Sequence, residues 1–316
     1  MIVTVTLNPS LDRTLEVAEL VRGGVHRSGP VGIDAGGKGV NISRALTANG
    51  HPTRAVLPVG GGDGDVLVDL LLRAGIDHVA VPIAGDVRSN VTVVEHDGTV
   101  TKINTPGPAL SRPEVDALIR TVLSVTDDAV WVACSGSLPP GAPTDIYARL
   151  IKALHAGGCA VAVDTTGEAL EFALAAGPDV IKPNIDELAA AVGREVTTLD
   201  EVVAAAQELR DRGARAVLVS LGADGAVLVD TDGATHGKAP VEIVRSTVGA
   251  GDAMLAGYLS AGGHGVDALA EALAWGAAAV QLPGSRMPGP ADIDRGLVRL
   301  LGQLPSTDAV PTGAEQ

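Results

Sequence analysis

The sequence predicts an α/β protein with a mostly parallel central sheet, helices on both faces of that sheet, and a small separate β-sheet. Short runs rich in Val and Ile alternate with longer runs rich in Ala and Leu along most of the chain. Two extended segments interrupt this alternation. With 316 residues, 46% of them hydrophobic, the chain can bury a large core, as one large domain or two smaller ones.

The alternation places each strand and helix of the main body. A short apolar run is typical of a strand that is buried on both faces of a parallel sheet. Strands are expected at residues 2–7, 54–59, 129–134, 160–163, 180–181, 216–220 and 226–229. Helices are expected at residues 40–49, 66–74, 113–125, 144–156, 199–212, 250–260 and 266–280.

The two extended segments predict a small β-sheet lid. Residues 11–32 contain no long helical period, and two short strands are expected at 90–95 and 100–104, joined by a turn that contains Asp97 and Gly98. We therefore divide the chain into three parts. The body is expected to comprise residues 1–10, 33–85 and 107–305, the lid residues 11–32 and 86–106, and a disordered tail residues 306–316.

Composition excludes several classes of function. A formal net charge of −15 disfavours nucleic acid and anionic membranes as partners. The first residues lack a basic region, and no apolar run approaches the roughly 20 residues that span a bilayer. Cys134 and Cys159 lie in apolar runs without metal-binding spacing, so we expect two buried thiols. These features predict a cytoplasmic protein.

The strongest local motif is STVGAGDAM at residues 246–254, which leads into an Ala- and Leu-rich helix. Gly249 and Gly251 allow backbone N–H groups to converge at a helix N-terminus, which favours a bound anion. Asp252 would then lie beside the anion, where a carboxylate can remove a proton from an attacking hydroxyl group. An ordinary N-cap is the alternative, and the motif alone leaves both open.

A second glycine-rich motif, DAGGKGVN at residues 34–41, also leads into a helix. Glycines around Lys38 let the backbone approach a ligand closely, and Asn41 lies one turn into the helix, where its amide can bond sugar hydroxyl groups. An ordinary strand-to-helix loop is the alternative. The chain contains neither a Walker A sequence nor a clean GxGxxG after its first strand, which disfavours a dinucleotide-binding fold.

Two further motifs follow predicted strands. In KPNIDEL at residues 182–188, Asn184 and Glu187 share one face of a helix start. They can hold a hydrated Mg²⁺ ion through water, or they can form a capping box. The segment SLGADGA at residues 220–226 indicates a hairpin turn with glycine at positive φ, whose exposed backbone a nucleotide can contact.

Three polar positions lie outside these motifs. The cations Arg88 and Lys102 in the lid strands can neutralise a substrate phosphate, or they can be solvated edge charges. Asp12 follows the first strand, where ligands of open α/β sheets bind, although it can also be a surface turn residue. The loop that carries Ser137 is expected to line a cleft with its backbone.

The order and spacing of GGKGVN, KPNIDE and GAGD resemble the ribokinase-like sugar kinases, also called the phosphofructokinase B family, over residues 2–304. Within that family, residues 6–12, 102–108, 135–141 and 246–252 are most similar to the bacterial 1-phosphofructokinase branch. The tagatose-6-phosphate kinase and minor 6-phosphofructokinase branches share most of these segments.

This resemblance implies a ribokinase-like fold and an enzyme that uses ATP and Mg²⁺ to phosphorylate a ketohexose phosphate, foremost fructose 1-phosphate. The 6-phosphofructokinase and tagatose-6-phosphate kinase reactions stay open, as do a kinase of an unphosphorylated sugar or nucleoside and a silent sugar sensor. The open lid strands suggest a homodimer. The resemblance implies that Asp252 is the base and that the anion hole is formed by Gly249, Ala250 and Gly251. It implies that the sugar phosphate contacts Asp12, Gly36, Gly37, Lys38, Asn41, Arg88, Asn90, Lys102 and Ser137. It implies that ATP contacts Lys182, Asn184, Ser220, Gly222 and Gly225, and that Mg²⁺ is held through water by Glu187.

Overall fold

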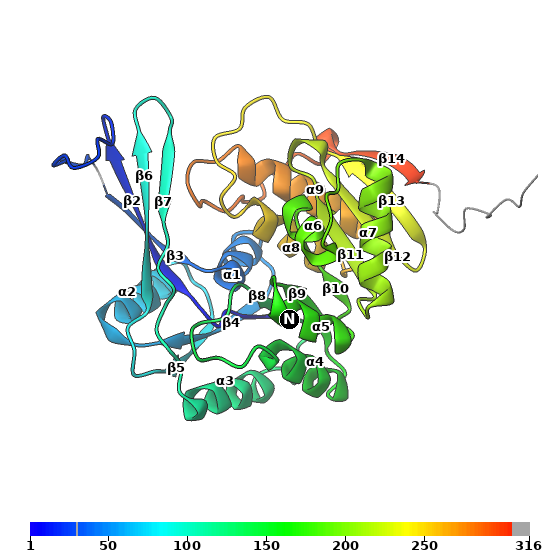
Figure 1. Ribbon diagram of the computed structural model, residues 1–316, viewed down its shortest axis with the longest axis horizontal. Helices are drawn as coiled ribbons and strands as arrows, with labels where there is room; N and C mark the ends of the chain where they lie inside the picture. Colours follow the sequence, from blue (N-terminus) through cyan, green and yellow to red (C-terminus); the bar gives the residue numbers. More distant parts are fainter. Residues whose placement is uncertain (30, 305–316) are drawn as a thin grey trace, which may run out of the picture.

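The computed structural model describes residues 1–29 and 31–304, and the predicted tail at 306–316 lies outside them (Figure 1). Within the described residues, the strands form one ten-stranded sheet and one four-stranded sheet. The ten strands run in the order β14 (Arg299–Leu304), β13 (Gly233–Lys238), β12 (Ala226–Asp230), β11 (Ala216–Ser220), β10 (Val180–Ile181), β9 (Ala160–Asp164), β8 (Trp131–Ser135), β1 (Ile2–Val5), β4 (Thr53–Val59) and β5 (His78–Pro82).

The large sheet is mostly parallel, as the sequence predicts. From β5 to β11 every neighbouring pair is parallel, and β12, β13 and β14 extend that sheet in antiparallel pairs. All seven strands expected from the sequence are present. The carboxyl ends of the parallel strands therefore meet along one edge of the sheet, which is where open α/β sheets bind ligands.

Helices cover both faces of the large sheet, because successive side chains of each strand point to opposite faces. Ile2 packs with residues of the helices on one face, and Val3 packs with those on the other. On the first face lie α1 (Lys38–Ala48), α2 (Gly61–Arg73), α8 (Ala250–Ser260) and α9 (Gly265–Val280). On the second lie α3 (Arg112–Ser124), α4 (Ile146–Ala156), α5 (Glu168–Ala175), α6 (Ile185–Val192) and α7 (Leu199–Asp211). Two short 3₁₀ helices are η1 (Gly222–Asp224) and η2 (Arg295–Leu297).

The predicted lid sheet is confirmed. Its strand order is β3 (Val31–Gly36), β2 (Ser10–Val17), β6 (Arg88–Glu95) and β7 (Val100–Ile103). The antiparallel pair β6–β7 includes the expected turn, with Gly98 at φ 91°. In Figure 1 the lid strands stand to one side of the large sheet, and α1 lies between them and α8. The strand ranges place residues 33–36 in the lid sheet, and the division into domains stays a prediction.

Helix α2 begins earlier than the sequence predicts, at Gly61 rather than at residue 66. Its glycine-rich start has a steric reason. A Cβ atom on Gly60 would collide with the carbonyl oxygen of Gly85, and one on Gly61 would collide with the carboxylate of Asp86. The glycines let the segment that leads into the lid pass close to the helix.

Among the helices of residues 1–29 and 31–304, none combines the length and apolar character needed to cross a membrane.

Candidate active site

Polar side chains gather where the parallel strands end. Asp164 is the last residue of β9, Lys182 follows β10 directly, and Ser220 is the last residue of β11. Asp164 and Lys182 are almost fully buried, at 1% and 4% exposure. Buried charges need partners, so these residues indicate a built polar site at this edge of the sheet.

The N-terminus of α8 faces this edge. Gly249 is its N-cap at φ 75°, a left-handed conformation, and a Cβ atom there would lie 2.5 Å from Cε of Met287. Ala250 and Gly251 form the first residues of the helix, whose opening N–H groups favour an anion. A Cβ atom on Gly251 would lie 3.1 Å from Nζ of Lys182, so an ammonium group stands next to this turn. The predicted anion site therefore has both backbone donors and a cation.

Asp252 lies in the first turn of α8 and is 7% exposed. The N-cap of the helix is Gly249, and Asp252 accepts a hydrogen bond instead from Nδ2 of Asn41, 2.8 Å from its Oδ2. The carboxylate is therefore not the helix cap, which was the alternative from sequence. It joins α8 to α1.

Burial raises the pKa of Asp252 to about 6, and the neighbouring carboxylate of Asp164 adds to this effect. The hydrogen bond from Asn41 and the ammonium groups of Lys182 and Lys38 act in the opposite direction. A carboxylate whose pKa lies near neutral pH is suited to accept a proton and release it again.

Asp164 forms ion pairs with two lysines, and the sequence analysis did not identify this aspartate as a site residue. Its Oδ1 lies 2.7 Å from Nζ of Lys38, and its Oδ2 lies 3.1 Å from Nζ of Lys182. Burial alone would favour the neutral form, but the two ammonium groups keep the pKa of Asp164 below its usual value. The sequence signal for this residue is that its carboxylate directly follows the apolar run at residues 160–163.

Asn184 and Glu187 form the capping box that the sequence offered as one alternative. Oδ1 of Asn184 accepts from the backbone N–H of Glu187 at 2.8 Å, and Oε2 of Glu187 accepts from the backbone N–H of Asn184 at 2.9 Å. Oε1 of Glu187 lies 3.4 Å from Nζ of Lys38. Within the described residues no three His, Cys, Asp or Glu side chains cluster as a metal site. This donor set fits an ion held through water, and the metal role stays a prediction.

The hairpin between β11 and β12 is confirmed. Gly222 has φ 59° and Gly225 has φ 86°, both in the region that favours glycine. The backbone N–H of Ser220 donates to the carbonyl oxygen of Pro183 at 3.0 Å, and Ser220 forms an isolated bridge with Asn184. Of the five positions expected at ATP, Lys182 and Asn184 thus follow β10, Ser220 ends β11, and Gly222 and Gly225 lie in the turn before β12.

On the lid side, three of the expected sugar-binding positions meet. The carboxylate of Asp12 accepts from Oγ of Ser10 at 2.7 Å and from Nδ2 of Asn90 at 3.0 Å. A Cβ atom on Gly36 would collide with this carboxylate, which explains the glycine at the end of β3. Gly37, at φ 112°, is the N-cap of α1 and so begins the helix that carries Lys38 and Asn41.

The expected phosphate-binding positions are more dispersed. Nη1 of Arg88 donates to the carbonyl oxygen of Thr105 at 3.1 Å. Lys102 is exposed on β7, and among the residues described it forms no ion pair. Ser137 is exposed, and its Oγ accepts from Nδ2 of Asn8 at 3.2 Å. Lys102 pairs with Thr92, two residues beyond Asn90 on β6, so its side chain lies on the same face of the lid sheet as Asn90. The phosphate role of Lys102 stays a prediction.

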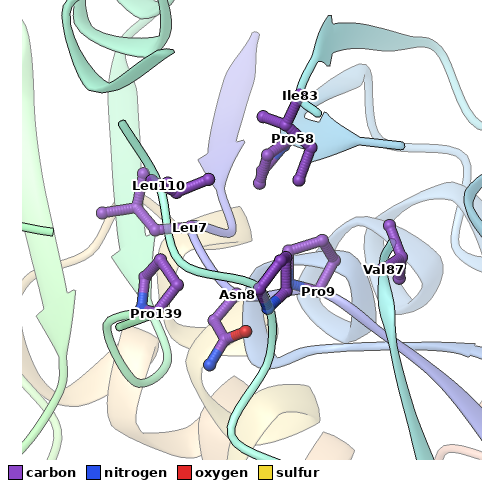
Figure 2. Close-up of a pocket in the computed structure, with 9 residues that line it drawn as sticks. Leu7, Asn8, Pro9, Pro58, Ile83, Val87, Leu110 and Pro139 are labelled. Carbon is purple, nitrogen blue, oxygen red and sulfur yellow. The ribbon is translucent and has the colours of Figure 1, made fainter. Parts of the chain in front are cut away.

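Asn8 lies at the root of the lid. Its Nδ2 also donates to the carbonyl oxygen of Pro106 at 3.0 Å, which ties the segment between β1 and β2 to the segment that leaves β7. Figure 2 shows Asn8 at a small pocket with Pro9, Pro58 and Ile83, and its amide group points away from Pro58 and Ile83. This packing fixes the segments that connect the two sheets.

Comparison with known proteins adds independent information. Residues 5–292 match the model of the pfkB family carbohydrate kinases. The chain is 39% identical to a 1-phosphofructokinase of Rhodobacter capsulatus over 295 residues, 92% of this chain and 93% of the relative. It is 39% identical to the ATP-dependent 6-phosphofructokinase isozyme 2 of Escherichia coli over 257 residues, 80% and 83% of the two chains. A crystal structure of phosphofructokinase-2 from Escherichia coli in complex with substrates and products superimposes with a TM-score of 0.87 at 35% identity, over 92% of this chain and 96% of that one.

Proposed function

The chain belongs to the pfkB family of carbohydrate kinases, and from this membership we propose that it transfers the γ-phosphoryl group of ATP to fructose 1-phosphate. The product would be fructose 1,6-bisphosphate. The observation that carries the proposal is the buried carboxylate of Asp252, next to a glycine turn and two lysines at the carboxyl edge of the sheet.

The proposed step is an in-line phosphoryl transfer. Asp252 takes the proton of the acceptor hydroxyl group, the hydroxyl oxygen bonds to the γ-phosphorus, and the bond between that phosphorus and the bridging oxygen of ADP breaks. The backbone N–H groups of Gly249, Ala250 and Gly251 would stabilise the charge on the equatorial oxygens. Lys182 supports this assignment, because its ammonium group stands beside the same turn.

The substrate would lie between lid and body. Asp12, Asn90 and Asn41 would hold sugar hydroxyl groups, and Arg88 would face the phosphate that the substrate already carries. The other residues proposed to contact the sugar phosphate are Gly36, Gly37, Lys38, Lys102 and Ser137. Closure of the lid over the sugar would exclude water and so limit hydrolysis of ATP.

ATP would bind along the ends of β10 and β11. Lys182, Asn184, Ser220, Gly222 and Gly225 would line its site. Mg²⁺ bound to the nucleotide would offset the negative charge of its phosphates, and Glu187 would hold water of that ion. A carboxylate at a helix N-terminus with a neighbouring lysine is consistent with this indirect role.

Phosphorylation of fructose 6-phosphate is the second candidate, because the identity to the 6-phosphofructokinase isozyme of Escherichia coli is equally high at 39%. Tagatose 6-phosphate is a further candidate substrate, because the tagatose-6-phosphate kinases share most of the segments 6–12, 102–108, 135–141 and 246–252. The lid cation Arg88 disfavours an unphosphorylated sugar or a nucleoside as the substrate. The presence of Asp252 and its glycine turn disfavours a sugar sensor without catalytic activity.

A substrate panel tests the proposal. Purified protein is given ATP, Mg²⁺ and each sugar or sugar phosphate in turn, and ADP release is measured with Asp252→Asn as the negative control. We expect the highest kcat/KM with fructose 1-phosphate. A higher value with fructose 6-phosphate or tagatose 6-phosphate would select that alternative, and absence of ADP release with every acceptor would favour the sensor.

We also propose a homodimer that forms through the lid. Strands β3 and β7 are the edges of the four-stranded sheet, and Ile33, Val100 and Ile103 on them are exposed. Open edges with apolar side chains favour pairing with a second chain. Sedimentation velocity should give a dimer for the unmodified protein and a monomer for Ile103→Lys; a monomer in both cases would argue against it.

A further inference from the structure

The side-chain amide of Asn41 lies between two groups with opposite hydrogen-bonding requirements. Its Oδ1 accepts from Nη1 of Arg44 at 3.1 Å, and its Nδ2 donates to Oδ2 of Asp252 at 2.8 Å. A guanidinium group can only donate hydrogen bonds, and an ionised carboxylate can only accept them. A single amide orientation therefore satisfies both neighbours.

The reversed amide would lose both contacts. Its N–H₂ group would then face the N–H groups of Arg44, and its carbonyl oxygen would face the carboxylate of Asp252. Both arrangements are repulsive and would leave buried polar groups unpaired. Arg44 and Asp252 therefore favour the same amide orientation, and Arg44 adds to the cost of reversing it.

Arg44 is itself held in place from three directions. Its Nη1 donates to the carbonyl oxygen of Ala35 at 3.3 Å and to Oγ of Ser285 at 3.4 Å, and its Nη2 lies 3.6 Å from Oδ1 of Asp34. Its side chain is only 17% exposed. The guanidinium group therefore has a fixed position between lid strand β3, helix α1 and the segment after α9.

The amide of Asn41 is also close to the anion turn. A Cβ atom on Gly249 would lie 3.8 Å from Nδ2 of Asn41. This orientation thus places an N–H donor at the point where the carboxylate and the glycine turn meet. A carbonyl oxygen at the same point would repel both a carboxylate and a phosphoryl group.

We propose that Arg44 is a positioning residue for phosphoryl transfer, which acts by holding the Asn41 amide in the orientation that donates to Asp252. The inference rests on the proposed function, because the role of the donor depends on the role of the base. Arg44 touches neither the anion turn nor Asp252 through a hydrogen bond, so its effect passes through Asn41.

Charged groups from several elements face Asp252. Asp164 of β9 raises its pKa, whereas Lys182 after β10 and Lys38 of α1 lower it, and Arg44 of α1 also interacts with it electrostatically. A substitution of Arg44 removes both a positive charge and the orientation of Asn41. The experiment must therefore separate the two effects.

A double-mutant cycle separates them. The pKa of Asp252 is measured by ¹³C NMR titration of the carboxyl group in the unmodified protein, Arg44→Met, Asn41→Ala and the double variant. Loss of the donor should raise the pKa by about 1 unit in Arg44→Met. In the Asn41→Ala background, Arg44→Met should raise the pKa of Asp252 by clearly less than it does in the unmodified protein, since only the charge of Arg44 is then lost. Equal shifts in both backgrounds would overturn the proposal.

The control is Arg73→Met, because Arg73 is an exposed arginine of α2 with one ion pair to Asp69. It should leave the titration unchanged. If Arg44→Met does not fold, Arg44→Gln passes through the same cycle, and its equal shift in both backgrounds would likewise overturn the inference.

Turnover provides a separate measurement. Arg44→Met should lower kcat and raise the KM of the sugar phosphate, with the KM of ATP nearly unchanged. The NMR titration needs no turnover. Absence of kinase activity in the unmodified protein would therefore refute the proposed function, while the cycle would still decide whether Arg44 positions Asn41.

Discussion

At the scale of residues, Asp252 combines burial with ionisation near neutral pH. Burial at 7% exposure disfavours a charged carboxylate, and Asp164 adds repulsion. The Asn41 amide and the two lysines offset part of this cost. A carboxylate in this balance is mostly ionised at pH 7 and still holds a proton more firmly than an exposed aspartate does.

The first prediction concerns activity and pH. Because only ionised Asp252 can accept the proton, kcat/KM should fall by about tenfold for each pH unit below about 6. Asp252→Asn should lower kcat by about 100-fold or more at pH 7.5. The control is Asp267→Asn, since Asp267 is an exposed aspartate in the first turn of α9. Near-normal turnover in Asp252→Asn would reject the base.

The second prediction concerns stability. The pKa of Asp252 is about 6 in the folded chain against an ordinary 3.8, so protonation favours the folded state. This contribution is fully present below pH 3.8 and is lost as the pH rises through 6. Asp252→Asn should therefore stabilise the protein at pH 8 by up to about 3 kcal/mol and give little gain at pH 4. Urea unfolding at both values measures this, and equal effects at the two pH values would contradict it.

At the scale of elements, three helices begin at the site. In α1 the first residue is Lys38, and in α6 and α8 the third residues are Glu187 and Asp252. The first turn of a helix has unpaired N–H groups and a partial positive charge, so it stabilises carboxylates and phosphates. The same geometry holds a capping carboxylate in α6 and the proposed base in α8.

The third prediction tests what Glu187 does. Gln can replace Glu in a capping box, so Glu187→Gln should keep the thermal stability of α6 almost unchanged. If Glu187 holds water of Mg²⁺, the variant should need more Mg²⁺ for half-maximal activity, because the amide lacks the negative charge. Asn184→Ala is the matched comparison, and loss of this N-cap should lower the free energy of unfolding by about 1 kcal/mol. An unchanged Mg²⁺ requirement in Glu187→Gln would leave only the capping role.

At the scale of the whole molecule, three chain segments connect the two sheets. Segments 7–9, 83–87 and 106–110 pass between the large sheet and the lid, and prolines pack around them (Figure 2). The body carries Asp252, the proposed base, and the strand ends proposed for ATP. The lid supplies Asp12, Asn90 and Arg88. The two substrates of the proposed reaction would thus contact different parts of the chain.

The fourth prediction follows from this division. Arg88→Ala should raise the KM of the sugar phosphate by about 10-fold or more, because a charge-assisted hydrogen bond to phosphate is lost. The KM of ATP should change little, since ATP is assigned to the body. Initial-rate kinetics with each substrate varied in turn measure both values. A similar rise in both would contradict the role of Arg88 in phosphate binding.

Much of the fold could be predicted because the signals are local. Apolar runs identified the parallel strands, and Asp97-Gly98 identified the lid hairpin. Strands β5, β13 and β14 and helix α5 were not anticipated. In the outer strands, partners elsewhere in the sheet determine the conformation, and periodicity within the segment is weak.

The sequence by itself determined the α/β class and the glycine turn before Asp252, since both depend on residues that are neighbours in the chain. Only the tertiary structure decided that Asp164 holds two lysines and that Arg44 orients Asn41 toward Asp252. These contacts join separate strands and helices. Their strength depends on burial and on distances of a few ångströms, which arise only when the chain has folded.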